Sequence, residues 1–455
     1  MAEDERERKE WLSRRELLRR AGLGTAVVLY SGAAPKTSVA AAPKFRHKEL
    51  RNTLKIIQWR HFVPAYDTWF DNTYIKVWGQ KNDTDVVVDH ILLTDLPSRA
   101  ASEVAARSGH DLFQHLSPPA QYEDQVINLK DIGQQATKNL GPMKGVSRRS
   151  TYNPKTKKWF GWPDNYVPDP VHYRTDWWGE AGVRPTTWEN VRRGAAKLKA
   201  DGHPIGIGMN NELDSNMALI ALMQCWGAYI QDAHANVTLN KKATVDAVKF
   251  MADLYRRGMT SDVFSWQPSS NNTAFLTGRI SLAFNAISIL RTAEAQNPTL
   301  ARNTAILPVP RGPKQALGLE HVMGVYTIWK FAEQKRLAKK FLLDMMVPSY
   351  NGHFLNSKFY NFPGWPGAVK NIKKKLAKDP SGKYVVLDRI SRTATANVGY
   401  PGFSNAAIDE IFNTGLIPQM FAQVAQGNKS AEDSVRDTAG EARRIFRKWR
   451  KRGKI

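Results

Sequence analysis

The sequence predicts an α/β fold with a mostly parallel sheet, because strand and helix patterns alternate along its first half. Residues 54–59, 85–91 and 111–114 are short apolar runs typical of buried strands. Residues 65–78 place apolar side chains at helical spacing, and residues 96–108 form an alanine-rich helical segment that a glycine follows. Strands that alternate with helices in this way are expected to lie parallel in one sheet.

The second half of the sequence continues the alternation, with more helix than strand. The run Thr186-Thr187-Trp188-Glu189 has the pattern of a capping box and is expected to begin a helix over residues 190–200. The proline-rich residues 305–313 are interpreted as a stiff connector. The remaining predicted elements are extended segments at 171–174, 280–285 and 321–329, and helices at 217–229, 242–257, 273–277 and 334–346.

A twin-arginine export signal is predicted over residues 1–42. Arg14 and Arg15 follow a serine and precede a weakly apolar run over residues 21–30. That run is shorter than the roughly 20 residues that span a bilayer, and the small residues 38–42 suit a signal peptidase. The alternative interpretation is a basic amphipathic helix. No cysteine lies near residues 30–45, so we expect a soluble periplasmic protein without a lipid anchor.

Composition excludes several classes of site. Cys225 is the single cysteine, which excludes an intramolecular disulfide and a cysteine-rich metal site. The formal net charge is +24, and residues 443–455 contain eight Lys or Arg and no acid. No nucleic-acid-binding motif accompanies this basic segment or the Lys373-Lys374-Lys375 cluster, so both are interpreted as solvated surfaces and no nucleic-acid partner is expected.

A search for catalytic motifs finds none. The sequence lacks the zinc helix His-Glu-x-x-His, the Gly-x-Ser-x-Gly nucleophile elbow and the glycine-rich phosphate and dinucleotide loops. The ten histidines are scattered, with no pair at the spacing of helical metal ligands. The pattern favours a binding protein over an enzyme and implies neither metal nor cofactor.

Aromatic residues beside small polar groups are the most suggestive feature of the predicted loops. They include Trp59 with His61, Asp164 and Asn165 after Trp162, Trp266, and Trp365 in a Pro-Gly loop. An aromatic ring packs against the C–H face of a sugar, while polar neighbours bond its hydroxyl groups. Each ring could equally be a packing anchor. The ends of the predicted parallel strands add Gln114 and His115 as candidates.

Several motifs in one order resemble the family 1 extracellular solute-binding proteins of ATP-binding-cassette importers, the group similar to maltose-binding protein. The clearest are the Tyr-Arg-Thr-Asp and Pro-Thr-Thr-Trp-Glu runs within residues 173–189 and the Phe-Leu-Thr-Gly-Arg-Ile-Ser-Leu-Ala-Phe run within residues 274–285. Residues 54–59, 109–113 and 246–258 resemble other parts of the family pattern.

This resemblance implies the two-lobed periplasmic binding protein fold of type II, with a ligand cleft between lobes joined by hinge strands. Lobe one is expected over residues 50–169 and 322–395, and lobe two over residues 170–321 and 396–455. In the loop where relatives usually carry a tryptophan, the sequence reads Asn285-Ala286-Ile287-Ser288, a departure that counts against a maltose-like ligand. With the aromatic pattern, the resemblance predicts ligand contacts from Trp59, His61, Gln114, His115, Asp164, Asn165, Asn216, Trp266, Asn285, Trp365 and Phe403.

The predicted function is that of a periplasmic receptor. It would bind a sugar, an oligosaccharide or a sugar-like polyol as a monomer and deliver it to the membrane permease of the importer. Its other expected partner is the twin-arginine translocase, during export. The open alternatives are the same fold with an anionic ligand, such as an acidic or phosphorylated sugar, and an exported enzyme. The sugar hypothesis predicts that replacing Trp59 or Trp365 by alanine weakens ligand binding.

Overall fold

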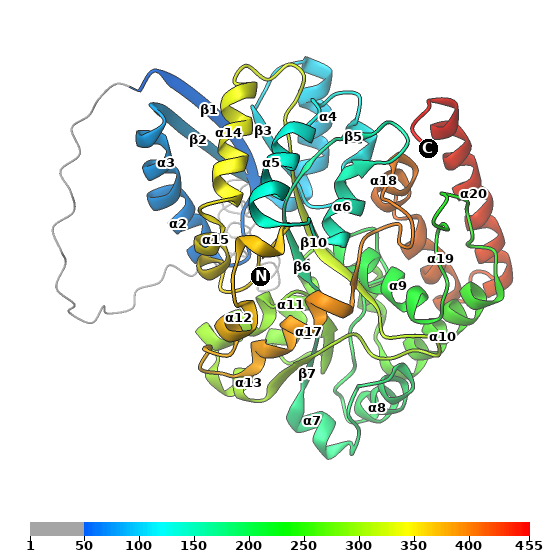
Figure 1. Cartoon of the computed structure of the whole chain (residues 1–455). Coiled ribbons are helices and arrows are strands. Elements are labelled where there is room, and N and C mark those ends of the chain that lie inside the picture. The colour runs from blue at the N-terminus through cyan, green and yellow to red at the C-terminus, as the bar shows by residue number, and fades with distance from the viewer. Residues whose placement is uncertain (1–49) are drawn as a thin grey trace, which may run out of the picture. The chain divides into compact units, whose positions relative to one another are not determined.

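Two β-sheets of unequal size organise the chain (Figure 1). The computed structural model describes residues 50–455, and the predicted export signal lies outside the described residues. The larger sheet has the strand order β11-β6-β10-β3-β1-β2, and β12 pairs with β10. Its strands are β1 (Asn52–Trp59), β2 (Thr84–Ile91), β3 (Leu112–His115), β6 (Trp162–Pro168), β10 (Gly318–Thr327), β11 (Phe362–Pro363) and β12 (Thr395–Ala396).

The larger sheet is mixed, which corrects the expectation of a mostly parallel sheet. Strand β1 runs parallel to β2 and to β3, as the alternation in the sequence predicts. Strand β10 comes from the second half of the chain and runs antiparallel to both β3 and β6. Because Trp59 pairs with Ile91 and Ile57 pairs with Phe113, the ends of β1, β2 and β3 meet at one edge.

The smaller sheet has the order β8-β7-β9, and both of its strand pairs are antiparallel. Its strands are β7 (Val171–Arg174), β8 (Leu282–Phe284) and β9 (Thr304–Leu307). Strand β9 lies in the segment that the sequence suggested was a connector, because the Thr-Ala-Ile-Leu run pairs with β7 before the prolines begin. A hairpin of β4 (Tyr152–Asn153) and β5 (Lys158–Trp159) stands apart from both sheets.

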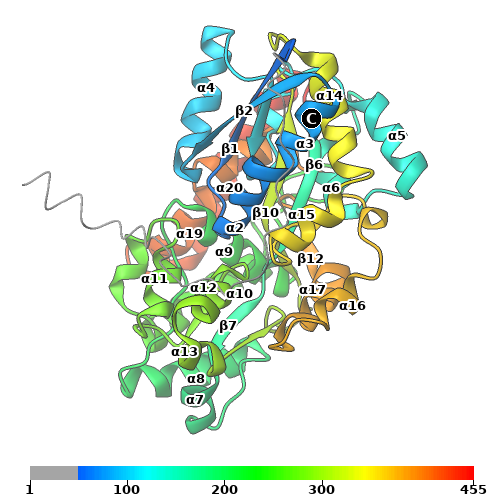
Figure 2. The same ribbon diagram turned by 90° about the vertical axis from the view of Figure 1, so that its left-hand side faces the viewer.

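Helices cover both faces of the larger sheet, with α4 on one side and α5 and α14 on the other (Figure 2). The helices of the first half are α2 (Pro64–Trp69), α3 (Ile75–Lys81), α4 (Leu96–Ala106), α5 (Lys130–Leu140), α6 (Gly145–Thr151), α7 (Thr175–Glu180), α8 (Trp188–Ala200) and α9 (Leu213–Cys225). Those of the second half are α10 (Lys242–Gly258), α11 (Ser270–Leu276), α12 (Ser288–Gln296), α13 (Pro298–Arg302), α14 (Lys335–Met346), α15 (Tyr350–Asn356), α16 (Ile372–Leu376), α17 (Val386–Thr393), α18 (Ala406–Asn413), α19 (Leu416–Ala425) and α20 (Ala431–Lys451).

Local chemistry explains where several helices begin. The Oγ1 atom of Thr187 accepts a hydrogen bond from the Asn190 backbone N–H at 3.1 Å, so Thr187 caps α8 within the predicted capping run. Helix α9 begins before the predicted residue 217, because Glu212 caps it. The predicted helix over residues 65–78 is interrupted by a π-helical turn, η1 (Phe70–Tyr74), between α2 and α3.

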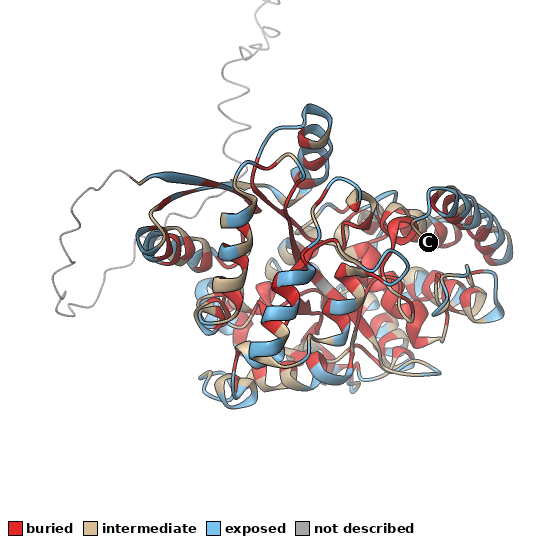
Figure 3. Ribbon diagram, turned by 45° about the horizontal axis from the view of Figure 1, so that its top comes forward, coloured by how far each residue is buried: buried red, intermediate tan, exposed pale blue. Residues whose placement is uncertain are grey.

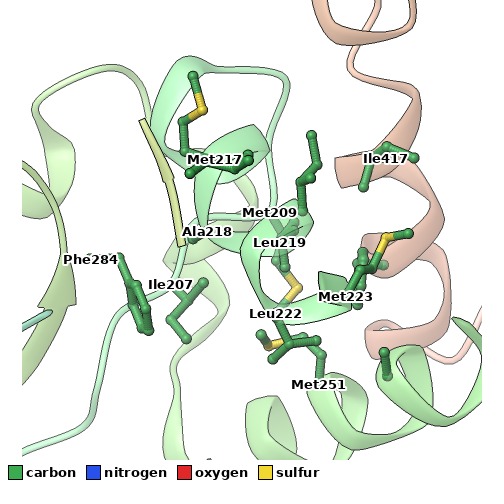
Figure 4. Packing of buried hydrophobic residues seen from close by; sticks show 14 of the residues in the cluster. Ile207, Met209, Met217, Ala218, Leu219, Leu222, Met223, Met251, Phe284 and Ile417 are labelled. Carbon is green, nitrogen blue, oxygen red and sulfur yellow. The ribbon is translucent and has the colours of Figure 1, made fainter. Parts of the chain in front are cut away.

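Two hydrophobic cores form, one around each sheet. The ribbon coloured by burial shows buried residues along the inner elements and exposed residues on the outer helices and loops (Figure 3). The core of the smaller sheet is built on α9, in which every residue from Ser215 to Cys225 is buried. Ile207, Met217, Leu219, Met223 and Phe284 are among the residues that build this core (Figure 4). None of the helices within residues 50–455 combines the length and the apolarity that a membrane span requires.

A buried acid lies in β10, close to where the chain leaves β12. The carboxylate of Glu320 accepts a hydrogen bond from the Val398 backbone N–H at 3.0 Å, and its side chain is fully buried. Burial raises the pKa of Glu320 from 4.5 to about 8. The folded chain therefore keeps this proton at pH values where the unfolded chain has lost it.

Replacing this acid should flatten the pH dependence of stability. Between about pH 5 and pH 8 the wild-type free energy of unfolding should fall as pH rises, because the folded state binds the extra proton. Glu320→Gln should reduce this slope by up to about 1.4 kcal/mol per pH unit, as measured by urea unfolding. Glu333→Gln, at a side chain that is 78% exposed, is the matched control. Parallel pH profiles for wild type and Glu320→Gln would contradict the assignment.

Candidate functional site

A cavity of about 320 Å³ lies between the two cores. One wall follows the carboxyl ends of β2 and β3, and the other comes from the start of α9, the loop before α11 and helix α18. The contributing segments are residues 93–97, 115–122, 211–216, 267–268 and 409–413. The volume is within the range of roughly 300–1,000 Å³ that is typical of ligand pockets.

The lining of this cavity mixes apolar side chains with polar ones, and the polar ones are not cationic. The described residues that line it include neither Lys nor Arg. Its two carboxyl groups belong to Glu212 and Asp409. The side chains with amide or hydroxyl groups are Thr94, Ser117, Gln121, Asn211, Asn216, Gln267 and Asn413, and those with rings are His115, Tyr122 and Phe412.

His115 ends β3 and contributes to the wall on the side of the larger sheet. Its Nε2 atom lies 3.2 Å from Oγ1 of Thr327, and its ring centroid lies 5.7 Å from that of Tyr122. Burial lowers the pKa of His115 to about 3. The imidazole is therefore neutral at physiological pH and can accept or donate one hydrogen bond.

The start of α9 builds part of the opposite wall. The Glu212 carboxylate accepts hydrogen bonds from the backbone N–H groups of Asp214 at 2.7 Å and Ser215 at 2.5 Å. Burial, together with the nearby Asp214 carboxylate, raises the pKa of Glu212 to about 8. Asn216 donates through Nδ2 to the Glu212 carbonyl at 3.1 Å, while its buried Oδ1 has no hydrogen-bond partner among the described residues.

One hydrogen bond crosses directly between the two walls. The Gln121 backbone N–H donates to Oδ2 of Asp409 at 2.9 Å, and the Asn413 Nδ2 donates to Oδ1 of the same carboxyl group at 2.6 Å. Burial raises the pKa of Asp409 to about 7. This contact joins the segment after β3 to α18 and narrows the cavity on that side.

The structure places two of the predicted ligand residues, His115 and Asn216, in the cavity lining. Gln114 precedes His115 in β3 but is buried and does not line the cavity. Trp59 ends β1 at the same edge of the sheet and His61 follows it by two residues, yet both are buried on the side of the larger sheet. His61 lies 3.2 Å from Oδ1 of Asn361 and accepts from the Val63 N–H at 2.9 Å.

Asp164 and Asn165 lie inside β6, where Asn165 donates to the Asp164 carboxylate at 2.8 Å. Burial raises the pKa of Asp164 to about 7. Trp365 is fully buried, with its ring centroid 4.6 Å from that of Trp162 and its Nε1 donating to Oγ1 of Thr137 at 3.1 Å. In this structure these three predicted residues pack in the core of the larger sheet, away from the cavity.

The three remaining candidates also lie beside or away from the cavity. Trp266 is buried and donates to the Asp262 carboxylate at 3.3 Å, while the adjacent Gln267 reaches the cavity. Asn285 is enclosed in an amide network and donates to Oδ1 of Asn272 at 2.6 Å. Phe403 packs near Tyr152, with ring centroids 6.0 Å apart.

Sequence reasoning missed the contribution of α18. Asp409 and Asn413 stand four residues apart on a helix whose other residues are mostly apolar. Asn405, four residues before Asp409, caps the helix. Polar residues at this spacing share one helix face, a signal that could have identified the wall. Within residues 50–455, no group of three His, Cys, Asp or Glu side chains is arranged to hold a metal ion.

Comparisons with known proteins give a consistent result. A family model described as bacterial extracellular solute-binding protein matches residues 73–383. No curated protein matches the sequence. Among solved structures, maltose-bound MalE3 of T. maritima is 17% identical with a TM-score of 0.73, over 86% of this chain and 99% of that one. The acarbose receptor GacH of Streptomyces glaucescens is 16% identical with a TM-score of 0.70, over 88% and 99%.

A third similar structure is an ABC transporter solute-binding protein from Agrobacterium radiobacter K84, in complex with ribitol. It is 16% identical with a TM-score of 0.69, over 88% of this chain and 100% of that one. At these identities the likeness concerns the fold, and it confirms the predicted two-lobed α/β fold. The lobe boundaries and the ligand residues stay predictions.

The burial of Trp365 leads to an expectation that differs from a ligand-contact role. Trp365→Ala should lower the free energy of unfolding by about 3–5 kcal/mol, because it leaves a cavity beside Trp162. Urea unfolding measures this loss. Trp177→Ala, at a half-buried tryptophan stacked on His203, should cost less. Unchanged stability in Trp365→Ala together with weakened ligand binding would contradict this expectation and support the ligand-contact role.

Proposed function

The chain belongs to the family of bacterial extracellular solute-binding proteins, and from this premise we propose that its ligand is a neutral sugar, oligosaccharide or polyol. The proposed site is the cavity between the two cores. The protein would hold the ligand there without chemical change and deliver it to the membrane permease of an ATP-binding-cassette importer. The family consists of binding proteins, and the proposal involves no catalytic step.

The chemistry of the cavity lining carries this proposal. Amide side chains donate and accept hydrogen bonds, so Asn211, Asn216, Gln267 and Asn413 can pair with ligand hydroxyl groups in either role. The rings of Tyr122 and Phe412 offer apolar faces for the C–H side of a sugar. A ligand with many hydroxyl groups and no charge matches this combination.

The alternative of an anionic ligand has less support. A buried anion needs cationic or multiple N–H partners, and the described lining provides two carboxyl groups and neither Lys nor Arg. The basic side chains that give the chain its charge of +24 are therefore not those that face the cavity. Maltose and ribitol, the ligands bound in two of the similar structures, are both neutral.

The route of the protein to its site of action is part of the same proposal. The twin-arginine pattern at Arg14 and Arg15 supports export by the twin-arginine translocase to the periplasm. We infer a soluble monomer there, free of a lipid anchor, which exchanges ligand with the permease.

A thermal-shift screen tests the ligand class. The purified chain should melt at a higher temperature with one class of neutral sugar or polyol, because a ligand that binds only the folded state stabilises it. The gain is about 2.7 kcal/mol at a ligand concentration a hundred times the dissociation constant. The ligand should be recovered chemically unchanged. A shift with sugar acids or sugar phosphates alone would contradict the neutral class, and consumption of the ligand would contradict the receptor function.

Asn216 is the residue of choice for locating the site. Asn216→Ala should weaken binding of the ligand found in the screen by about 1–3 kcal/mol, because a buried amide loses its hydrogen bond to the ligand. Titration calorimetry measures the change. Asn356→Ala is the matched control, since Asn356 also donates to the carbonyl four residues earlier but does not line the cavity. Equal affinities for the Asn216 variant and wild type would place the ligand elsewhere.

A further inference from the structure

Helix α20 is a long amphipathic helix at the edge of the molecule (Figure 1). One face packs into the core of the smaller sheet and against α18 and α19. The buried residues on that face are Ala431, Ser434, Val435, Thr438, Ala439, Ala442, Ile445, Phe446 and Trp449. The outer face is exposed (Figure 3). Because the inner face is packed in the core, the backbone that carries the exposed side chains is held in place.

Three cations stand in line on the exposed face: Arg443, Arg447 and Lys451, which we name the α20 basic stripe. They lie four residues apart, so they follow one another along the helix over about 12 Å. Within residues 50–455, none of the three forms an ion pair. The adjacent cations do form ion pairs: Arg444 with Glu441 and Lys448 with Glu410.

The fold itself gives no reason for this arrangement. Like charges four residues apart on a helix repel one another and destabilise it. Cations favour the C-terminal end of a helix, but this effect is confined to the last turn. Arg443 and Arg447 lie eight and four residues before Lys451, the last residue of α20. The stripe therefore concentrates positive charge where the folded chain does not neutralise it.

The turn of the β4–β5 hairpin extends the same charged surface. The hairpin is tied to the end of the chain, because Asn153 Nδ2 donates to the Lys454 carbonyl at 3.2 Å and Lys155 Nζ donates to Ile455 O at 2.5 Å. Lys157, in the same turn, is exposed and makes no ion pair within the described chain. The positive surface thus continues past the end of α20.

We propose that the α20 basic stripe binds the anionic headgroups of a phospholipid membrane surface. The inference rests on the proposed function in one respect, since a receptor that delivers to a permease works beside such a surface. Clustered Lys and Arg side chains are attracted to anionic lipid headgroups. The large exposed apolar side chains of the described chain are Val77, Val87, Leu92 and Leu355, none of them in α20. Binding is therefore electrostatic, without insertion into the bilayer.

The stripe is connected to the ligand cavity through α18. Glu410 in α18 accepts a hydrogen bond from Trp449 Nε1 and forms an ion pair with Lys448, both of α20. The adjacent Asp409 lines the cavity. A membrane that holds α20 therefore also fixes the position of one cavity wall relative to the membrane surface.

Vesicle sedimentation with the full chain tests the proposal. The probe is a set of vesicles of phosphatidylcholine with about one third phosphatidylglycerol, compared with pure phosphatidylcholine, at about 50 mM salt. Wild type should bind the anionic vesicles, and the variant R443E/R447E/K451E should bind them at least about tenfold more weakly. The matched control is K373E/K374E/K378E, which removes the same charge from exposed lysines around α16. Wild type, the stripe variant and the α16 variant all keep the basic N-terminal residues, so any contribution of these residues to vesicle binding is the same in all three.

The outcomes distinguish binding by the α20 basic stripe from binding that depends only on the net charge of the protein. Retained binding in the α16 variant and loss in the stripe variant support the proposal, as does loss of wild-type binding at about 500 mM salt. Equal loss in both variants, or equal binding of the stripe variant and wild type, overturns it. Wild-type binding to DNA but not to the vesicles also overturns it. R443Q/R447Q/K451Q repeats the test if the reversed variant fails to fold, and the ligand-induced thermal shift, unchanged in the stripe variants, reports separately on the proposed function.

Discussion

The burial of α9 from Ser215 to Cys225 is the constraint on which the rest of the structure depends. A helix whose every residue from Ser215 to Cys225 is buried must satisfy the N–H groups of its first turn without help from bulk water. The Glu212 carboxyl group accepts short hydrogen bonds from two of these N–H groups, those of Asp214 and Ser215. The same turn places Asn216 at the cavity, with an amide oxygen that has no partner among the described residues. The start of α9 therefore both leads into the core of the smaller sheet and lines the cavity.

Within the described chain, the titratable residues of the cavity favour their uncharged forms, while unpaired cations lie on the outer face of α20. Burial raises the pKa of Glu212 to about 8 and that of Asp409 to about 7, while it lowers that of His115 to about 3. All three shifts favour the uncharged form of a cavity residue near neutral pH. The unpaired cations of α20 face outwards instead. A neutral interior and a basic exterior allow ligand selection and surface attraction to be controlled by separate residues.

Sequence patterns predicted much of the fold, and two of the predicted ligand residues, His115 and Asn216, line the cavity. The strand–helix alternation identified β1, β2 and β3, and parallel pairing explains why His115 reaches the cavity. The pairing of β10 with β3 and β6 depends on contacts between distant segments, which no local pattern reveals. Trp365 and Asn285 had the expected residue types in the expected loops, but packing against Trp162 and bonding to Asn272 enclose them. An aromatic or amide residue in a loop signals a buried partner as readily as a ligand.

The hydrogen bond between Gln121 and Asp409 holds the two cavity walls together but is weak enough to break when a ligand enters. The two residues are 288 positions apart and join the two walls through a single backbone N–H donor. Because either protonation state of a carboxyl group can accept this hydrogen bond, the contact survives titration of Asp409 near its pKa of about 7. A hydrogen bond of this kind contributes about 1 kcal/mol net, which thermal motion overcomes easily. Opening of the walls is therefore cheap at this point, and a ligand that pairs with amides on both sides would supply most of the free energy that keeps them together.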